Sequence, residues 1–101
     1  MNIQQIEVHE HYQALHPEAL VLYHLPGQYI LLGNDVKRAL ESIPNLQIIS
    51  EGVAALPDEF YYLSTLSETG AEVCLVQYRN DNGVLDWPDV KRLREENVTD
   101  Y

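Results

Sequence analysis

The residues best suited to chemistry in this 101-residue chain are four histidines and one cysteine. His9 and His11 would point to opposite sides of a helix and would share a face only on a strand. His16 precedes a proline and His24 lies inside an apolar run, so we expect exposed or hydrogen-bonded imidazoles and no metal site. Cys74 stands among valines and a leucine with no base beside it, which favours a buried thiol over a nucleophile.

Other patterns of catalytic residues are missing from the sequence. The glycines are scattered at turn positions, so no phosphate-cradling loop is present and no nucleotide is expected to bind. The acid pairs Asp58-Glu59 and Glu95-Glu96 are expected at a helix start and in a tail, and not as a general acid and base. We therefore expect no enzyme activity and no cofactor, although a deep pocket lined by His24 and a carboxylate would favour a small enzyme.

Charge is the most informative bulk property of the chain. Sixteen acidic residues oppose six lysines and arginines, which gives a formal charge of −10. Proteins that bind duplex DNA neutralise its phosphates with basic side chains, and unless the few cations here gather on one face, DNA meets a repulsive field. These cations are Lys37, Arg38, Arg79, Lys91, Arg92 and Arg94. DNA is thus a disfavoured partner, and a protein partner or a homo-oligomer is favoured.

The composition is typical of a folded cytoplasmic protein. Hydrophobic residues make up 46% of the chain, an ordinary fraction for a globular domain. One cysteine excludes an internal disulfide bond, no apolar run reaches membrane-spanning length, and the N-terminal residues lack the pattern of a secretory signal. We expect a cytoplasmic location and no contact with a membrane.

The elements that position these residues are organised around residues 19–40. Two apolar runs, at 19–25 and 29–32, predict strands joined by a Pro-Gly turn. Asn34 is expected to cap a following helix, with Asp35 in its first turn, where the helix dipole favours negative charge. Apolar residues at i, i+3 and i+4 then give this helix a face that packs against the hairpin.

The rest of the chain is expected to cover this unit or to extend its sheet. The sequence predicts a helix at 3–15, a strand at 46–50 and a loop at 51–56. A helix opened by Pro57 follows, and its inward face is expected to carry Phe60, Leu63, Leu66 and Ser67. After it we expect a strand at 73–78 covered on both faces, a short edge strand at 84–87, a polar helix from 88 to about 95 and a frayed tail at 95–101. We therefore expect an α/β fold in a single domain, 1–101, with a mixed β-sheet of about four to five strands flanked by three to four helices.

A resemblance extends from Tyr12 to Tyr78. The residues that carry it are Pro17-Glu18-Ala19, Leu22-Tyr23, Tyr29, Asp35-Val36-Lys37 with Ala39, Gly52-Val53, Tyr61, Leu63 or Leu66, Gly70, Val73 and Gln77. In order and spacing they resemble the N-terminal mismatch-recognition domain (domain I) of the bacterial DNA mismatch-repair protein MutS. The resemblance implies a stand-alone, diverged copy of that domain, with its α/β fold.

The resemblance also implies a site that recognises the mismatched base, called the reading site below, and this sequence departs from the family at that site. In the family a Phe-x-Glu motif on the second strand reads the lesion, and the equivalent positions here are Gln28 and Ile30, on either side of Tyr29. Gln28 offers little stacking and Ile30 cannot hydrogen-bond a base edge. A slip of one residue would bring Tyr29 forward as a stacking residue.

Two functions follow from these observations. The first is a non-catalytic protein-interaction or accessory module, in which an aromatic patch of Tyr61, Tyr62 and Trp87 contacts a partner. The alternative is retained binding of mismatched DNA, with Tyr29 stacking on a base and Lys37, Arg38 and Arg79 on phosphates. The second function requires these cations to share a face with Tyr29. A DNA-mimic variant of the first predicts regularly spaced surface carboxylates.

Overall fold

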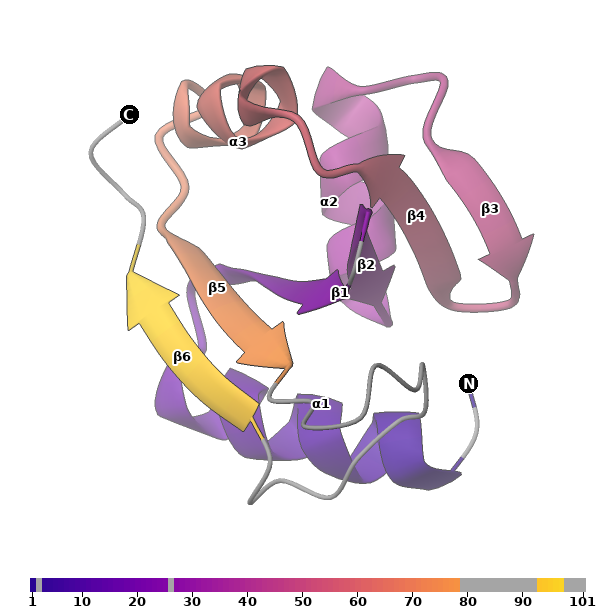
Figure 1. The fold of residues 1–101 in the computed structure, drawn as a ribbon, viewed down its shortest axis with the longest axis vertical. Helices are drawn as coiled ribbons and strands as arrows, with labels where there is room; N and C mark the ends of the chain where they lie inside the picture. Colours follow the sequence, from indigo (N-terminus) through magenta and orange to yellow (C-terminus); the bar gives the residue numbers. More distant parts are fainter. Residues whose placement is uncertain (2, 26, 79–92, 98–101) are drawn as a thin grey trace.

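The computed structural model describes residues 1, 3–25, 27–78 and 93–97, and this part of the chain forms three helices and six strands (Figure 1). In chain order they are α1 (Ile3–Leu15), β1 (Leu20–Leu25), β2 (Gln28–Leu32), α2 (Asn34–Ser42), β3 (Gln47–Ser50), β4 (Val53–Pro57), α3 (Phe60–Ser67), β5 (Val73–Tyr78) and β6 (Leu93–Asn97).

The six described strands form one mixed sheet in the order β3-β4-β2-β1-β5-β6. β1 and β5 are parallel, with Leu22 opposite Leu75, and the other neighbours are antiparallel. The β1–β2 hairpin occupies the two central places, with Tyr23 opposite Ile30. The two strands of the unit at residues 19–40 are therefore the centre of the sheet, as the sequence predicted.

Helices cover both faces of this sheet: α2 and α3 lie on one side and α1 on the other (Figure 1). Side chains alternate along β1, so that Leu20 and Leu22 belong to the core under α2 and α3, whereas Val21 and Tyr23 belong to the core under α1. β5 shows the same alternation and is buried on both faces. This confirms the expectation for residues 73–78, because a strand covered twice is apolar throughout.

Most of the predicted elements are confirmed. The helix at 3–15, the two central strands, the helix after them, the strand near 46–50, the third helix and the strand at 73–78 all lie where the sequence placed them. The coarse fold, an α/β domain with a mixed sheet, is also confirmed, although the sheet has six described strands and not four to five.

The predicted loop at 51–56 is wrong. Val53–Pro57 forms β4, which pairs with β2 on one side and β3 on the other. The sequence did not indicate strand β4, because Ala54 and Ala55 have weak β-propensity. In the sheet Ala54 is fully buried and Ala55 is 6% exposed, and they belong to the cores on opposite faces.

The C-terminal predictions are partly wrong. Leu93–Asn97 forms β6, antiparallel to β5, where the end of a polar helix and the start of a frayed tail were expected. The backbone of Leu93–Asn97 pairs with β5 although its side chains are mostly polar, so the polar sequence alone did not indicate a strand. The predicted strand at 84–87, the rest of the predicted helix at 88–92 and residues 98–101 lie outside the described residues.

Three local expectations at the helix starts are also wrong. Pro57 ends β4 and does not open α3. Phe60 is 60% exposed and does not face inward, although Leu63 and Leu66 do. Asn34 makes no side-chain cap of α2; the residue before the helix is Gly33, which has a φ of 61°, a conformation that glycine adopts without strain.

Candidate functional site

The three positions of the expected reading site lie at the middle of the sheet. Gln28 is half-buried at the start of β2, Tyr29 is 5% exposed in the core under α2 and α3, and Ile30 is 3% exposed in the core under α1. The Tyr29 ring lies 4.9 Å, centroid to centroid, from the ring of His24 on the paired strand. A base cannot stack on a Tyr29 ring that is covered in this way.

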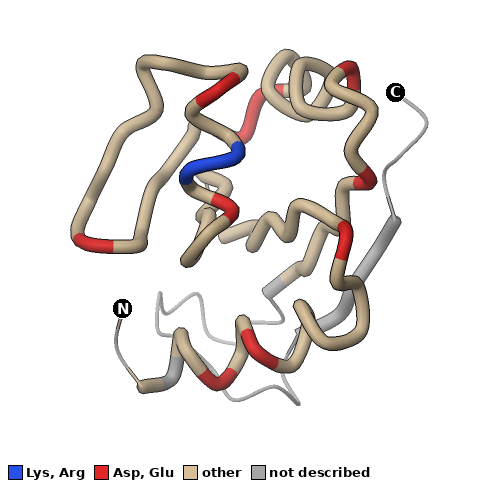
Figure 2. The backbone as a smooth tube through the Cα atoms, turned by 180° about the vertical axis from the view of Figure 1, so that it is seen from behind, with Lys and Arg blue, Asp and Glu red and all other residues tan. Residues whose placement is uncertain are grey.

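The expected phosphate contacts differ in their surroundings. Lys37 is exposed, whereas the half-buried Arg38 donates hydrogen bonds to the carbonyls of Ala19 (3.1 Å) and Glu18 (3.1 Å). Figure 2 shows this pair as the blue segment of α2, among acids spread over helices and turns without a continuous row. Arg79 lies outside the described residues. Of the described pair, Lys37 is exposed, whereas the Arg38 guanidinium is already bound to backbone carbonyls.

The aromatic patch expected for protein contact is partly placed. Tyr61 is 66% exposed, and Tyr62 is half-buried against the core under α2 and α3. Their rings meet edge to face at 5.2 Å. Trp87 lies outside the described residues.

The histidines do not converge in the described part of the chain, and no group of three or more histidines, cysteines or acids there could hold a metal ion. His24 lies 3.2 Å from the Asp58 carboxylate, but their side chains are 32% and 39% exposed and the pair is not in a closed site. Cys74 is a fully buried strand residue, as expected.

A buried polar cluster, which the sequence did not reveal, joins α1, β1 and α2. Asp35 is 1% exposed, and its carboxylate accepts hydrogen bonds from the Val21 backbone N–H (3.2 Å) and the Arg38 guanidinium (3.4 Å). The imidazole Nδ1 of His9 lies 3.0 Å from the Tyr23 hydroxyl. His9 Nε2 lies 3.9 Å from Asp35 Oδ2, beyond hydrogen-bond distance.

The electrostatics of this cluster follow from its burial. Loss of water lowers the pKa of His9, and the negative charge of Asp35 offsets only part of this effect. Burial likewise raises the pKa of Asp35, against the opposing effects of the Val21 N–H, His9 and Arg38. Burial also raises the pKa of Tyr23, so its hydroxyl stays protonated. The cluster is therefore a structural polar network, and nothing in it activates a nucleophile.

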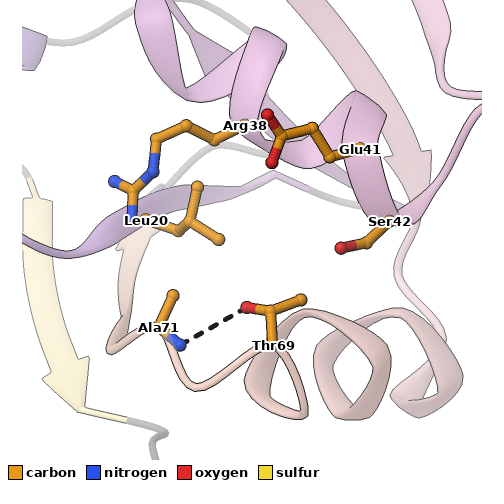
Figure 3. Close-up of a pocket in the computed structure, with 6 residues that line it drawn as sticks. All are labelled: Leu20, Arg38, Glu41, Ser42, Thr69 and Ala71. Carbon is orange, nitrogen blue, oxygen red and sulfur yellow. Dashed lines mark hydrogen bonds between the residues drawn. The ribbon is translucent and has the colours of Figure 1, made fainter.

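A small cavity lies between the end of α2 and the turn after α3 (Figure 3). It measures about 220 Å³, and Arg38, Glu41, Ser42 and Thr69 bring polar atoms to it. Two of these groups are already engaged: Arg38 binds backbone carbonyls, and the Thr69 hydroxyl donates to the Leu66 carbonyl (2.7 Å) and accepts from the Ala71 N–H (3.3 Å). The cavity is therefore a weak candidate for a ligand site.

Among the strand residues whose burial the structure describes, the most accessible large apolar side chains lie on β3, at the outer edge of the sheet. All four residues of Gln47–Ser50 are exposed, and none of them is charged. Ile48 is 52% exposed and Ile49 is 55% exposed. β3 pairs only with β4 in the described sheet, so its other side presents backbone N–H and C=O groups. The sequence predicted this strand but gave no sign that it lies at the edge.

No protein-family model matches the chain, and no curated protein matches it. Among the described residues, no helix is both long and apolar enough to cross a membrane.

Proposed function

We propose that this chain is a non-catalytic protein-interaction module, and that a partner protein binds it by adding an extended segment to β3. The observation that carries the proposal is the exposed edge with Ile48 and Ile49. Natural sheets blunt such edges with charged side chains, proline, bulges, short strands or a covering element. β3 has neither a charge nor a proline, so its free backbone groups are a template for another strand.

Two features of β3 favour a specific partner over open-ended aggregation. The strand has only four residues, and its register with β4 shifts between Ile48 and Ser50. A short, irregular edge pairs over a limited length, which opposes growth of a long sheet. The chain's formal charge of −10 opposes approach of a second copy and favours a neutral or basic segment.

The scaffold of this module is proposed to be a diverged relative of the mismatch-recognition domain of MutS. Support comes from the order of elements at the start of the chain. A helix, a strand, a turn containing glycine, a second strand and an acid-bearing helix follow each other as the resemblance implies.

A synthetic peptide is the probe for strand addition. It is fluorescein-labelled, alternates valine with lysine over eight residues, and is titrated with the protein while anisotropy is measured. The control peptide has the same charge, with proline in place of each valine. We expect the valine peptide to bind and the proline peptide to bind at least about tenfold more weakly, because proline cannot donate to a strand ladder.

Two protein variants locate the binding. Ile48→Ser should weaken the valine peptide about tenfold or more, whereas Ile3→Ser, at a 75% exposed isoleucine on α1, should leave it unchanged. Equal affinity in both variants, or equal binding of the two peptides, would refute strand addition at β3. Sedimentation at the same concentrations tests whether a second copy of this chain binds β3. A dimer that Ile48→Ser abolishes would show that the partner at β3 is a second copy and not another protein.

Retained DNA binding is the alternative prediction, and the surroundings of Tyr29 and Arg38 do not favour it. Its test is the anisotropy of a labelled duplex, matched or with one G·T mismatch, at low and high salt. Salt-sensitive preference for the mismatch would support DNA binding, because counterion release makes phosphate contacts depend on salt.

A further inference from the structure

Helix α1 is attached to the sheet by a contact surface that is half polar. Among its described side chains the buried ones are Gln5, Val8, His9 and Tyr12, of which Val8 and Tyr12 join the apolar core. Meanwhile its exposed residues include three large apolar side chains, at positions 3, 6 and 15. The helix therefore buries little of its own apolar surface where it docks.

The opposite face of the sheet is covered differently. α2 and α3 contribute five buried apolar residues to their core, namely Val36, Ala39, Ile43 just after α2, Leu63 and Leu66. Because apolar burial is the main contribution to docking, the two layers are unequal. Among the described side chains, α1 is also the helix with the largest polar share of its buried residues, because Gln5 and His9 are two of four.

His9 is the least satisfied buried group in the α1 contact. Its Nε2 is buried and has no hydrogen-bond partner among the described residues. If Nδ1 carries the proton and donates to Tyr23, the lone pair of Nε2 faces the Asp35 carboxylate. If Nε2 carries the proton, its N–H points across 3.9 Å without bonding. Either neutral tautomer leaves one nitrogen unsatisfied, and release of α1 would give it water.

The groups that face His9 come from each element around it. Asp35 on α2 lies on the Nε2 side, with Arg38 bound to its carboxylate, and Tyr23 on β1 lies on the Nδ1 side. Tyr12 on α1 and Cys74 on β5 lie around Tyr23 and act on its hydroxyl. Among the described residues, only Asp35 brings an opposite charge to a protonated His9, and its carboxylate already accepts hydrogen bonds from Val21 and Arg38 and lies 3.9 Å away.

We propose that α1 is a displaceable cover that docks with His9 neutral, so that acidification from neutral pH releases α1 and exposes the apolar sheet face beneath it. Burial lowers the pKa of His9 in the docked helix, so the released helix binds a proton that the docked helix does not. Release therefore becomes more favourable as the pH falls below about 6.5, the ordinary histidine value.

Asp35 sets the lower end of this pH range. Burial raises its pKa, so the docked state takes up a proton at Asp35 before the released state does. This uptake favours docking again at lower pH. Release is thus promoted between the pH at which His9 begins to titrate and the pH at which buried Asp35 becomes neutral.

The test is hydrogen–deuterium exchange of the full chain by NMR at pH 7.0 and pH 5.5, corrected for intrinsic exchange rates. Protection of the α1 amides should fall, by up to about eightfold if docked His9 stays neutral at pH 5.5. Protection of β1 and β5 should change less. His9→Gln should abolish the pH effect on α1, and His11→Gln, at an exposed histidine two residues away, should retain it.

Several outcomes would overturn the proposal. They are α1 protection that matches β1 at both pH values, a pH effect that persists in His9→Gln, and an imidazole pKa of His9 at or above 6.5 in the same spectra. If His9→Gln does not fold, Asp35→Asn is the second variant. It removes the group that restores docking, so α1 protection should continue to fall toward pH 4.5, and levelling as in the wild type would contradict the assigned role.

Discussion

Replacing Arg38 by methionine tests whether this arginine is a structural residue or a phosphate contact. Its guanidinium holds the Ala19 and Glu18 carbonyls at 3.1 Å each and the Asp35 carboxylate at 3.4 Å. Hydrogen bonds to charged groups contribute about 1.5–3 kcal/mol each when well formed. The side chain is 35% exposed, so water replaces part of this contribution, and we expect a loss of about 2 kcal/mol for the set. Methionine retains the packing of the aliphatic stem.

Urea denaturation followed by circular dichroism measures this loss. With a slope of about 1 kcal/mol per M, the midpoint of Arg38→Met should fall by roughly 2 M. The matched control is Lys37→Met, the neighbouring exposed cation, which should stay within about 0.5 kcal/mol of the wild type. Equal midpoints for the two variants would refute the structural role and return Arg38 to the set of candidate DNA contacts.

The pH dependence of the same variant separates its two kinds of bond. Arg38 lowers the pKa of Asp35, but burial raises that pKa by more, so the net shift is upward. Above the folded pKa of Asp35, Arg38→Met leaves a buried carboxylate without its cation. As the pH falls and Asp35 is protonated, that part of the loss should disappear, and only the part due to the two carbonyls should remain. A loss that grows on acidification would contradict this reasoning.

Three other changes test the packing and the buried acid. Gly33→Ala should cost about 1–2 kcal/mol in urea denaturation, because φ is 61° and the added Cβ would lie 3.3 Å from the His9 ring; a neutral effect would contradict the assigned conformation. Tyr29→Ala should cost about 3–4 kcal/mol, whereas Tyr61→Ala should cost less than about 0.5 kcal/mol; similar losses would mean that Tyr29 is not in the core. The third change is Asp35→Asn. As the pH falls from the raised pKa of Asp35 toward its ordinary value of 3.8, the wild type should gain stability relative to this variant, because the folded state binds a proton at Asp35 that the unfolded state does not. A relative loss of stability would show that the pKa of Asp35 is not raised.

The sequence was sufficient for elements whose signals are local. The apolar runs at 19–25 and 29–32 and the helical spacing at 36, 39 and 40 depend on neighbouring residues, and these two strands and the helix formed as predicted. β4 failed this test because its alanines are weak strand formers. Its stability comes from pairing with β2 and β3, which no local pattern reports.

The candidate sites were harder to predict because their parts are distant in sequence. His9 and Tyr23 are 14 residues apart, as are Val21 and Asp35, and only the layering of α1 and α2 over β1 brings them together. The sequence predicts that Asp35 lies in the first turn of a helix, where the helix dipole favours negative charge, and no neighbouring residue indicates that it is buried. Its burial requires the Val21 N–H and Arg38 at the same place. Likewise, the edge position of β3 is a property of the strand order, which adjacent residues do not encode.

Net charge and the β3 edge act on a partner at different distances. The field of a chain with a formal charge of −10 extends over roughly a Debye length, about 8–10 Å at physiological salt, and repels other acidic surfaces before contact. At contact, Gln47–Ser50 offers no charge, so the backbone groups and two isoleucines decide whether a segment binds. Charge would then select which partners approach, and the edge would select which of them stay. On this reasoning, the charge would oppose pairing of β3 with a second copy of the chain, although β3 itself carries no charge.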